Sequence, residues 1–191
     1  QETPSTETPA AAPAATASLE AIVAPGVLMQ KLAIDFVFDT AGQPCWVNGD
    51  LYFTNNNFDP RDKSQTMKLD AQGALTVVRP NNGVNTCTYA TGKGTFYCCE
   101  MLGHRVVEMA PDGSVVRTVA GEYNGVRLDG PNDIAMDAKG GIYFTDSRFS
   151  PGEDLLQDAP AVYYVKPDGG IIRVIEGIEY PNGLELSPDG A

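Results

Sequence analysis

The chain has 191 residues, and its 13 basic and 25 acidic side chains give a formal net charge of −12 at neutral pH. An acidic chain of this kind excludes a partner held through its phosphate backbone, because such binding needs a basic face. No apolar run approaches the ~18 residues of a membrane-spanning helix, and the 42% hydrophobic content is that of an ordinary globular domain. We therefore expect no nucleic-acid partner and no membrane insertion.

Residues 1–18 form a low-complexity segment in which fifteen residues are Ala, Thr, Pro or Ser. Such a segment cannot bury apolar surface, so the sequence predicts a disordered tether ahead of a folded region over residues 19–191. A tether of this composition at a processed N-terminus is typical of exported proteins. We therefore expect a secreted or periplasmic protein whose signal peptide has been removed.

Paired hairpins repeat along the rest of the chain. Three glycine turns each lead into an aromatic strand, and each is followed by a second hairpin with an Asp/Gly turn. The first turns and strands lie at residues 48–55, 92–100 and 139–146, and the second turns at residues 70–73, 111–113 and 167–169. Two consecutive hairpins make a four-stranded unit, and units of about 40 to 50 residues are typical of β-propeller blades.

The repeats predict an all-β chain that supplies the first three to four blades of a propeller. The expected blades cover residues 44–80, 85–120 and 132–176, and the next one begins at residues 182–191. A chain with three complete blades and part of a fourth would leave unpaired strand edges, which propellers avoid by closing the ring. We therefore expect the remaining blades to come from a second chain or from a continuation of this one.

An asparagine opens the first strand of successive units, at Asn85, Asn132 and Asn182. The first strand of each blade lines the central channel of a propeller, so these side chains would converge on one mouth of the channel as an oxygen-rich ring. The alternative is that each asparagine only caps a turn, as this residue often does. Three equivalent positions favour a site.

The spacing of two of the four cysteines places them opposite each other across a hairpin only if its turn has two residues. If Gly92 and Lys93 form a two-residue turn, Cys87 and Cys98 lie directly opposite each other on neighbouring strands. This arrangement is compatible with a disulfide or with two buried thiols, because directly opposed strand positions seldom suit disulfide geometry.

Several motifs, in order and spacing, resemble the family of gluconolactonase, senescence marker protein and luciferin-regenerating enzyme. They are Pro44-x-Trp46, Gly49-x-Leu51-Tyr52-Phe53-Thr54-Asn55, Gly130-Pro131-Asn132-Asp133, Gly141-Ile142-Tyr143-Phe144-Thr145-Asp146 and Pro181-Asn182-Gly183. The resemblance implies a six-bladed propeller with a divalent metal at the channel mouth, and hydrolysis of a lactone or related ester. It also implies that this chain holds roughly the first three to four of the six blades.

Carried over position by position, the resemblance makes Asn182 a metal ligand, Asn132 a ligand or substrate contact, and Asn85 a substrate contact. Oxygen donors of this kind suit calcium or magnesium better than zinc. The carboxylate that accepts a proton from the attacking water is an Asp in a later blade of the family, and it is expected beyond Ala191. The catalytic residue is therefore unknown within this chain.

The sequence departs from the family at the first metal ligand, a Glu that the spacing places near Ala41. Its absence supports an alternative function, a non-catalytic propeller that binds a small molecule or a protein. A strictosidine-synthase-like propeller is a third and weaker option. Lactone hydrolysis remains the leading hypothesis because Asn132 and Asn182 are present.

Three other polar residues are assigned to structure. His104, the single histidine, is expected in an outer loop between strands rather than in catalysis. Glu100 and Asp146 end equivalent second strands, and we expect them to brace the blades by accepting hydrogen bonds from backbone groups or arginines.

Overall fold

The computed structural model describes residues 26–28, 36–57, 63–147 and 155–190, with the side chain of Cys87 left out. Contacts divide the chain into Gln1–Ile34 and Asp35–Ala191, and the second unit carries the strands. The predicted tether over residues 1–18 lies outside the described residues.

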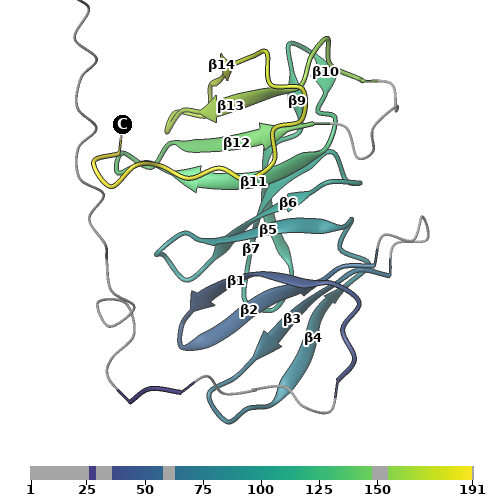
Figure 1. Cartoon of the computed structure of the whole chain (residues 1–191), viewed down its shortest axis with the longest axis vertical. Coiled ribbons are helices and arrows are strands. Elements are labelled where there is room, and N and C mark those ends of the chain that lie inside the picture. The colour runs from purple at the N-terminus through teal and green to yellow at the C-terminus, as the bar shows by residue number, and fades with distance from the viewer. Residues whose placement is uncertain (1–25, 29–35, 58–62, 148–154, 191) are drawn as a thin grey trace, which may run out of the picture. The chain divides into compact units, whose positions relative to one another are not determined.

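Three four-stranded antiparallel sheets follow one another in the second unit, each in simple up-and-down order (Figure 1). The first sheet holds β1 (Ala41–Val47), β2 (Asp50–Asn55), β3 (Gln65–Leu69) and β4 (Leu75–Pro80). The second holds β5 (Asn85–Ala90), β6 (Phe96–Glu100), β7 (Arg105–Met109) and β8 (Val115–Ala120). The third holds β11 (Pro131–Met136), β12 (Ile142–Asp146), β13 (Ala161–Val165) and β14 (Ile171–Ile175). A small ribbon of β9 (Glu122–Tyr123) and β10 (Val126–Arg127) connects the second sheet to the third.

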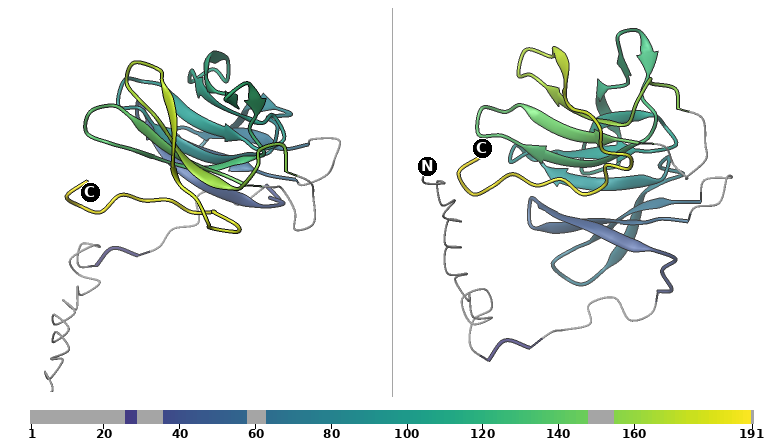
Figure 2. Two further views of the ribbon diagram at one scale, coloured as in Figure 1. Left: turned by 90° about the horizontal axis from the view of Figure 1, so that it is seen from above. Right: turned by 45° about the horizontal axis from the view of Figure 1, so that its top comes forward.

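The described residues are all-β, as the hairpin repeats predict, and no helix among them could cross a membrane. The observed sheets cover residues 41–80, 85–120 and 131–175. The fourth blade is expected from residue 182, but residues 176–190 contain no assigned strand. Instead they run beside β11, where the Leu184 N–H donates to Asp133 Oδ2 at 2.8 Å (Figures 1 and 2).

Local turn chemistry explains why the outer hairpins form. An aspartate at each turn accepts the N–H two residues further on, as in the 2.9 Å bond from the Ser114 N–H to Asp112 Oδ1. Gly113 follows with a φ of 85°. A Cβ at this glycine would lie 2.2 Å from the Val78 carbonyl oxygen, so glycine also allows this turn to approach β4 of the first sheet.

The hydrophobic core lies between neighbouring sheets. One buried cluster joins the first two sheets, and in it the rings of Tyr52 and Phe96 lie 4.9 Å apart. A second cluster joins the last two sheets and contains fully buried Phe144 and Tyr163. Because each sheet packs its face against the next, the first strands β1, β5 and β11 come side by side.

The register of the second sheet corrects one prediction. The β5–β6 loop spans Thr91 to Thr95, closed by the Thr91 N–H bond to the Thr95 carbonyl at 3.0 Å, and is longer than the expected two-residue turn. The strand partner of Cys98 is consequently Thr88 and not Cys87. The predicted opposition of Cys87 and Cys98 is therefore wrong.

Candidate functional site

The first strand of every sheet contains a β-bulge at the same place. The pairing shifts by one residue between Gly42 and Cys45 in β1, between Asn85 and Thr88 in β5, and between Pro131 and Ile134 in β11. A bulge bends the strand and redirects its side chains. The three bulges lie where the three first strands enter the centre of the molecule, so they act on the same region.

Residues at these bulges line one cavity of about 160 Å³. Its walls are uncharged and combine threonine hydroxyls, glutamine and asparagine amides and one glycine with the apolar parts of the same side chains. The lining residues are Thr40, Gly42, Gln43, Thr54, Asn56, Thr86, Asn132 and Asn182. The structure thus brings Asn132 and Asn182 into one cavity, although 50 residues separate them in the sequence.

Asn85 is not among the residues that line the cavity. The register pairs Asn85 with Glu100 and Pro131 with Asp146, so Asn85 is equivalent to Pro131. The residue equivalent to Asn132 is Thr86, one position further on. The predicted equivalence of Asn85 with Asn132 is therefore off by one residue, and Asn85 is fully buried within the sheet.

The register places Gly42 at the position near Ala41 where the sequence analysis expects the missing first ligand. Gly42 pairs with Thr54 as Ala41 pairs with Asn55, which makes Gly42 the equivalent of Thr86 and Asn132. Gly42 lines the cavity, and a Cβ added there would meet no atom within 4 Å. The nearby Asp39 does not replace the carboxylate, because its Oδ2 accepts a 3.0 Å hydrogen bond from Asn57 Nδ2 and it does not line the cavity.

Threonine hydroxyls connect the first strands around the cavity. Thr88 donates to the Gln43 carbonyl and thereby ties β5 to β1. Thr86 donates to the Pro131 carbonyl at 3.0 Å, which ties β5 to β11. Thr145 donates to the Asn182 carbonyl at 2.7 Å. These bonds fix the backbone of the rim and use hydroxyl protons that would otherwise face the cavity.

Asn56 is a lining residue that the sequence analysis missed. It follows β2 in the run Thr54-Asn55-Asn56-Asn57, and its side chain is 5% exposed. Its Nδ2 donates to the Asn85 carbonyl at 2.7 Å. The bond crosses from the first sheet to the second, so the only signal in the sequence is an unusual asparagine run at a strand end.

No carboxylate lines the cavity, and the described residues contain no group of three His, Cys, Asp or Glu side chains that could hold a metal. Asp133, which follows the lining residue Asn132, is engaged by the N–H groups of Ile134 and Leu184 at 2.9 and 2.8 Å. His104 lies in a turn with Nδ1 3.0 Å from the Leu128 carbonyl oxygen, away from the cavity. The donor set is therefore one of neutral oxygens, which fits a hard cation and not zinc.

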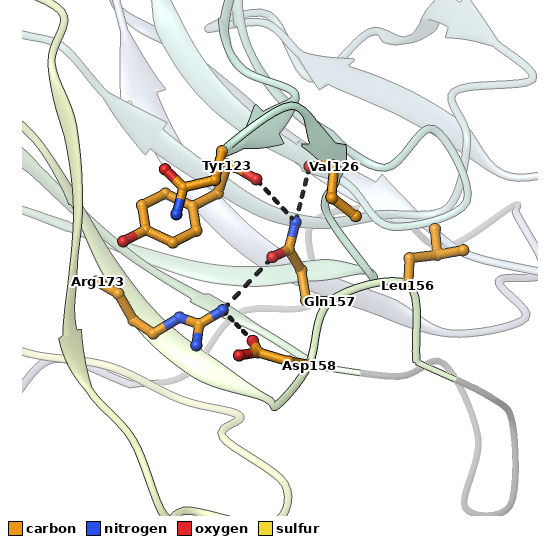
Figure 3. A pocket seen from close by; sticks show the side chains of 7 residues that line it. Tyr123, Val126, Leu156, Gln157, Asp158 and Arg173 are labelled. Atoms are coloured by element: carbon orange, nitrogen blue, oxygen red, sulfur yellow. Dashed lines mark hydrogen bonds and ion pairs between the residues drawn. The ribbon is translucent and has the colours of Figure 1, made fainter.

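A larger cavity of about 460 Å³ lies at the β9–β10 ribbon (Figure 3). Two of its polar side chains are engaged by the protein: Gln157 Nε2 donates to the Val126 carbonyl at 2.7 Å, and Arg173 Nη2 is 2.5 Å from Asp158 Oδ1. Arg173 also lies 5.2 Å from the centre of the Tyr123 ring. These contacts support the loop structurally, and the cavity offers less chemistry than the smaller one.

Consecutive four-stranded antiparallel sheets, arranged with their first strands at one polar cavity, define a β-propeller. The model of the SMP-30/gluconolactonase/LRE-like region matches residues 43–191. The chain belongs to this family, and the predicted fold class is confirmed: it forms part of a propeller.

Individual relatives match over shorter stretches. A gluconolactonase from Zymomonas mobilis is 34% identical over 76 residues, which cover 37% of this chain and 21% of that protein. The protein strictosidine synthase-like 3 from Arabidopsis thaliana is 30% identical over 94 residues, covering 45% of this chain and 24% of that protein. The solved structure of a gluconolactonase from Xanthomonas campestris superposes with a TM-score of 0.67 at 25% identity, over 78% of this chain and 52% of that one. The chain thus spans about half of this solved relative, and its three sheets agree with a ring of about six blades.

Proposed function

We propose that the protein is a hydrolase of a lactone or related ester that uses a hard divalent cation, calcium or magnesium. The observation that carries the proposal is the cavity at the first strands, in which Asn132 and Asn182 meet. Membership of the gluconolactonase family supports the reaction class, and the neutral oxygen lining supports the kind of ion. Export of the protein, and the source of the remaining blades, stay predictions of the sequence.

The residues that would hold the cation are Asn132 and Asn182, with Gln43 as a further oxygen donor on the rim. A bound divalent ion would supply charge that polarises the lactone carbonyl. The side-chain amide of Asn132 also has N–H groups that can donate to a ring or carbonyl oxygen and so orient the substrate. The threonine bonds to the Pro131 and Asn182 carbonyls hold the backbone that carries these two side chains.

A second function has one observation in its favour. The described lining residues include no carboxylate, whereas a calcium site usually contains several. A propeller that binds a small ligand without hydrolysing it would need none. The two functions differ in turnover, so activity measurements separate them.

Hydrolysis of a panel of sugar lactones by the purified full-length protein tests the proposal. We expect activity with calcium or magnesium and its loss after chelation. Asn182→Ala should reduce kcat/KM by about a hundredfold or more, on the scale of losing one group that stabilises the transition state. His104→Ala, a residue outside the cavity, should leave activity within about twofold of the unmodified protein, as do most substitutions away from buried and functional groups. Cation binding without turnover of any lactone would favour the non-catalytic function.

A further inference from the structure

Asn56 differs from the other lining residues in that it is both buried and incompletely hydrogen-bonded. Its side chain is 5% exposed, and its Oδ1 is buried without a hydrogen-bond partner among the described residues. Asn56 is also one of the residues that line the cavity at the first strands. A buried carbonyl oxygen without a partner is unfavourable, so its presence calls for a ligand.

The orientation of the Asn56 amide is fixed by its neighbours. Nδ2 donates to the Asn85 carbonyl at 2.7 Å and lies 3.5 Å from Thr54 Oγ1. A reversed amide would place Oδ1 against the Asn85 carbonyl oxygen, where two acceptors would repel each other. The amide therefore keeps its N–H groups on the protein, and Oδ1 is the atom that remains for a ligand.

The surrounding hydrogen bonds favour a cation over an anion. Thr54 Oγ1 donates to the Gly42 carbonyl at 3.2 Å, and Thr86 Oγ1 donates to the Pro131 carbonyl at 3.0 Å. Both hydroxyl protons point toward backbone oxygens, and the Asn56 amide donates to the Asn85 carbonyl and toward Thr54 Oγ1. At this end of the cavity the Asn56 carbonyl oxygen and the Thr86 hydroxyl oxygen therefore keep lone pairs, and oxygen lone pairs attract a hard cation.

We propose that Asn56 Oδ1 is a ligand of a divalent cation in this cavity, and that it supplies an oxygen where glycine occupies the equivalent first-ligand position at Gly42. The inference rests on the proposed function for the existence of the cation site. It adds a ligand from the residue after β2, whereas Asn132 belongs to the first strand β11 and Asn182 to the segment that runs beside β11.

Calorimetric titration of the full-length protein with calcium chloride tests this ligand. Asn56→Ala should weaken calcium binding by at least about tenfold, the scale on which even the partners of metal ligands act. Asn57→Ala is the matched control, because Asn57 is the adjacent asparagine and donates to Asp39 instead of lining the cavity. It should leave the calcium affinity within about twofold, as expected of a residue outside the site.

The outcomes separate this ligand from the proposed function. If the unmodified protein binds no calcium or magnesium, the metal-dependent function fails and the ligand assignment fails with it. If the protein binds calcium and Asn56→Ala binds it equally well, only the ligand assignment is overturned. A rise in lactone KM with unchanged calcium affinity would also overturn it, because Asn56 would then contact substrate and not the ion.

A second variant controls for the fact that Asn56→Ala also removes the hydrogen bond to the Asn85 carbonyl. Asn56→Ser keeps a side-chain donor but places no carbonyl oxygen in the cavity, and thermal unfolding without calcium reports whether each variant is folded. A folded Asn56→Ser protein with weakened calcium binding supports the ligand, and one with unchanged binding contradicts it. The second variant therefore decides the matter even where Asn56→Ala does not fold.

Discussion

At the scale of single residues, the last position of the second strand has the same structural role in the first and third sheets. Asn55 Oδ1 accepts the N–H of Asp39 at 2.9 Å. Asp146 accepts the N–H groups of Asp129 and Gly130 at 2.9 and 2.7 Å. Both side chains anchor the backbone just before the first strand of their own sheet, which confirms the prediction that Asp146 braces its blade.

Burial raises the pKa of Asp146 to about 7, although the two backbone N–H groups oppose the shift and the Asp129 carboxylate adds to it. The folded protein then keeps this proton at pH values where the unfolded chain, with a pKa near 3.8, has lost it. The contribution of this group to stability is therefore present below about pH 4 and is lost as the pH rises toward 7.

Asp146→Asn should remove this part of the pH dependence. Between pH 4 and 7, the free energy of unfolding of the unmodified protein should fall more steeply than that of the variant, by up to about 1.4 kcal/mol per pH unit. Urea unfolding at several pH values measures the slopes. Asp137→Asn is the control: the Tyr164 hydroxyl lowers the pKa of the partly buried Asp137, so its effect lies at lower pH. Parallel slopes for the unmodified protein and Asp146→Asn would show that Asp146 is ionised throughout this range.

At the scale of elements, Glu100 joins the first two sheets. Its side chain is 2% exposed, and its two carboxylate oxygens lie 2.6 Å from Arg79 Nη2 and 2.6 Å from Arg105 Nε. Arg79 belongs to β4 of the first sheet, while Glu100 and Arg105 belong to the second. The carboxylate therefore connects two blades in addition to the hydrophobic cluster between them.

Glu100→Gln should destabilise the protein by about 1.5–3 kcal/mol, because it removes charged hydrogen bonds at a buried carboxylate while Arg79 and Arg105, 18% and 38% exposed, stay partly solvated. Glu108→Gln makes the same substitution in the pair with Arg117, whose side chain is 54% exposed, and should cost less than about 1 kcal/mol. Chemical denaturation of both variants measures the difference. Equal losses for the two would mean that Glu100 does not bind the blades together more strongly than a surface pair does.

The elements also show which parts of the molecule the sequence could predict. Asp/Gly turns and the aromatic strands that follow glycine turns are local signals in the sequence. They therefore predict the four-stranded units with bounds close to the observed ones. The bulges shift the register by a single residue without a local signal. They occur at the same place in all three first strands and so do not offset one strand from another. Thr86 lies ten residues before Phe96, as Asn132 does before Ile142, whereas Asn85 lies eleven before Phe96 and was matched by residue type alone. In the first sheet the β1–β2 turn between Val47 and Asp50 is shorter than the other two, so the equivalent position is Gly42, one residue beyond Ala41. Asn56 was missed because its partner, the Asn85 carbonyl, is 29 residues away in another sheet.

At the scale of the whole molecule, the blades bring weak local features together into one site. A single threonine, asparagine, glutamine or glycine at the start of a strand does not by itself indicate a binding site. Three bulged first strands and the segment beside β11 place such residues around one cavity, and hydroxyl bonds between the strands hold them there. The central claim is that this cavity binds a hard divalent cation.

Calcium titration of the full-length protein and of Gly42→Glu tests that claim most directly. A Cβ at Gly42 meets no atom within 4 Å, so glutamate can enter the cavity and add the missing charge. Calcium affinity should rise by at least about tenfold, because unit charges 4 Å apart attract by about 1–4 kcal/mol between water and a protein surface. Ala41→Glu adds the same charge at an exposed residue outside the cavity and should change the affinity far less. We predict that the unmodified protein binds calcium, that Gly42→Glu binds it more tightly, and that Ala41→Glu does not. If neither the unmodified protein nor Gly42→Glu binds calcium, the claim is contradicted.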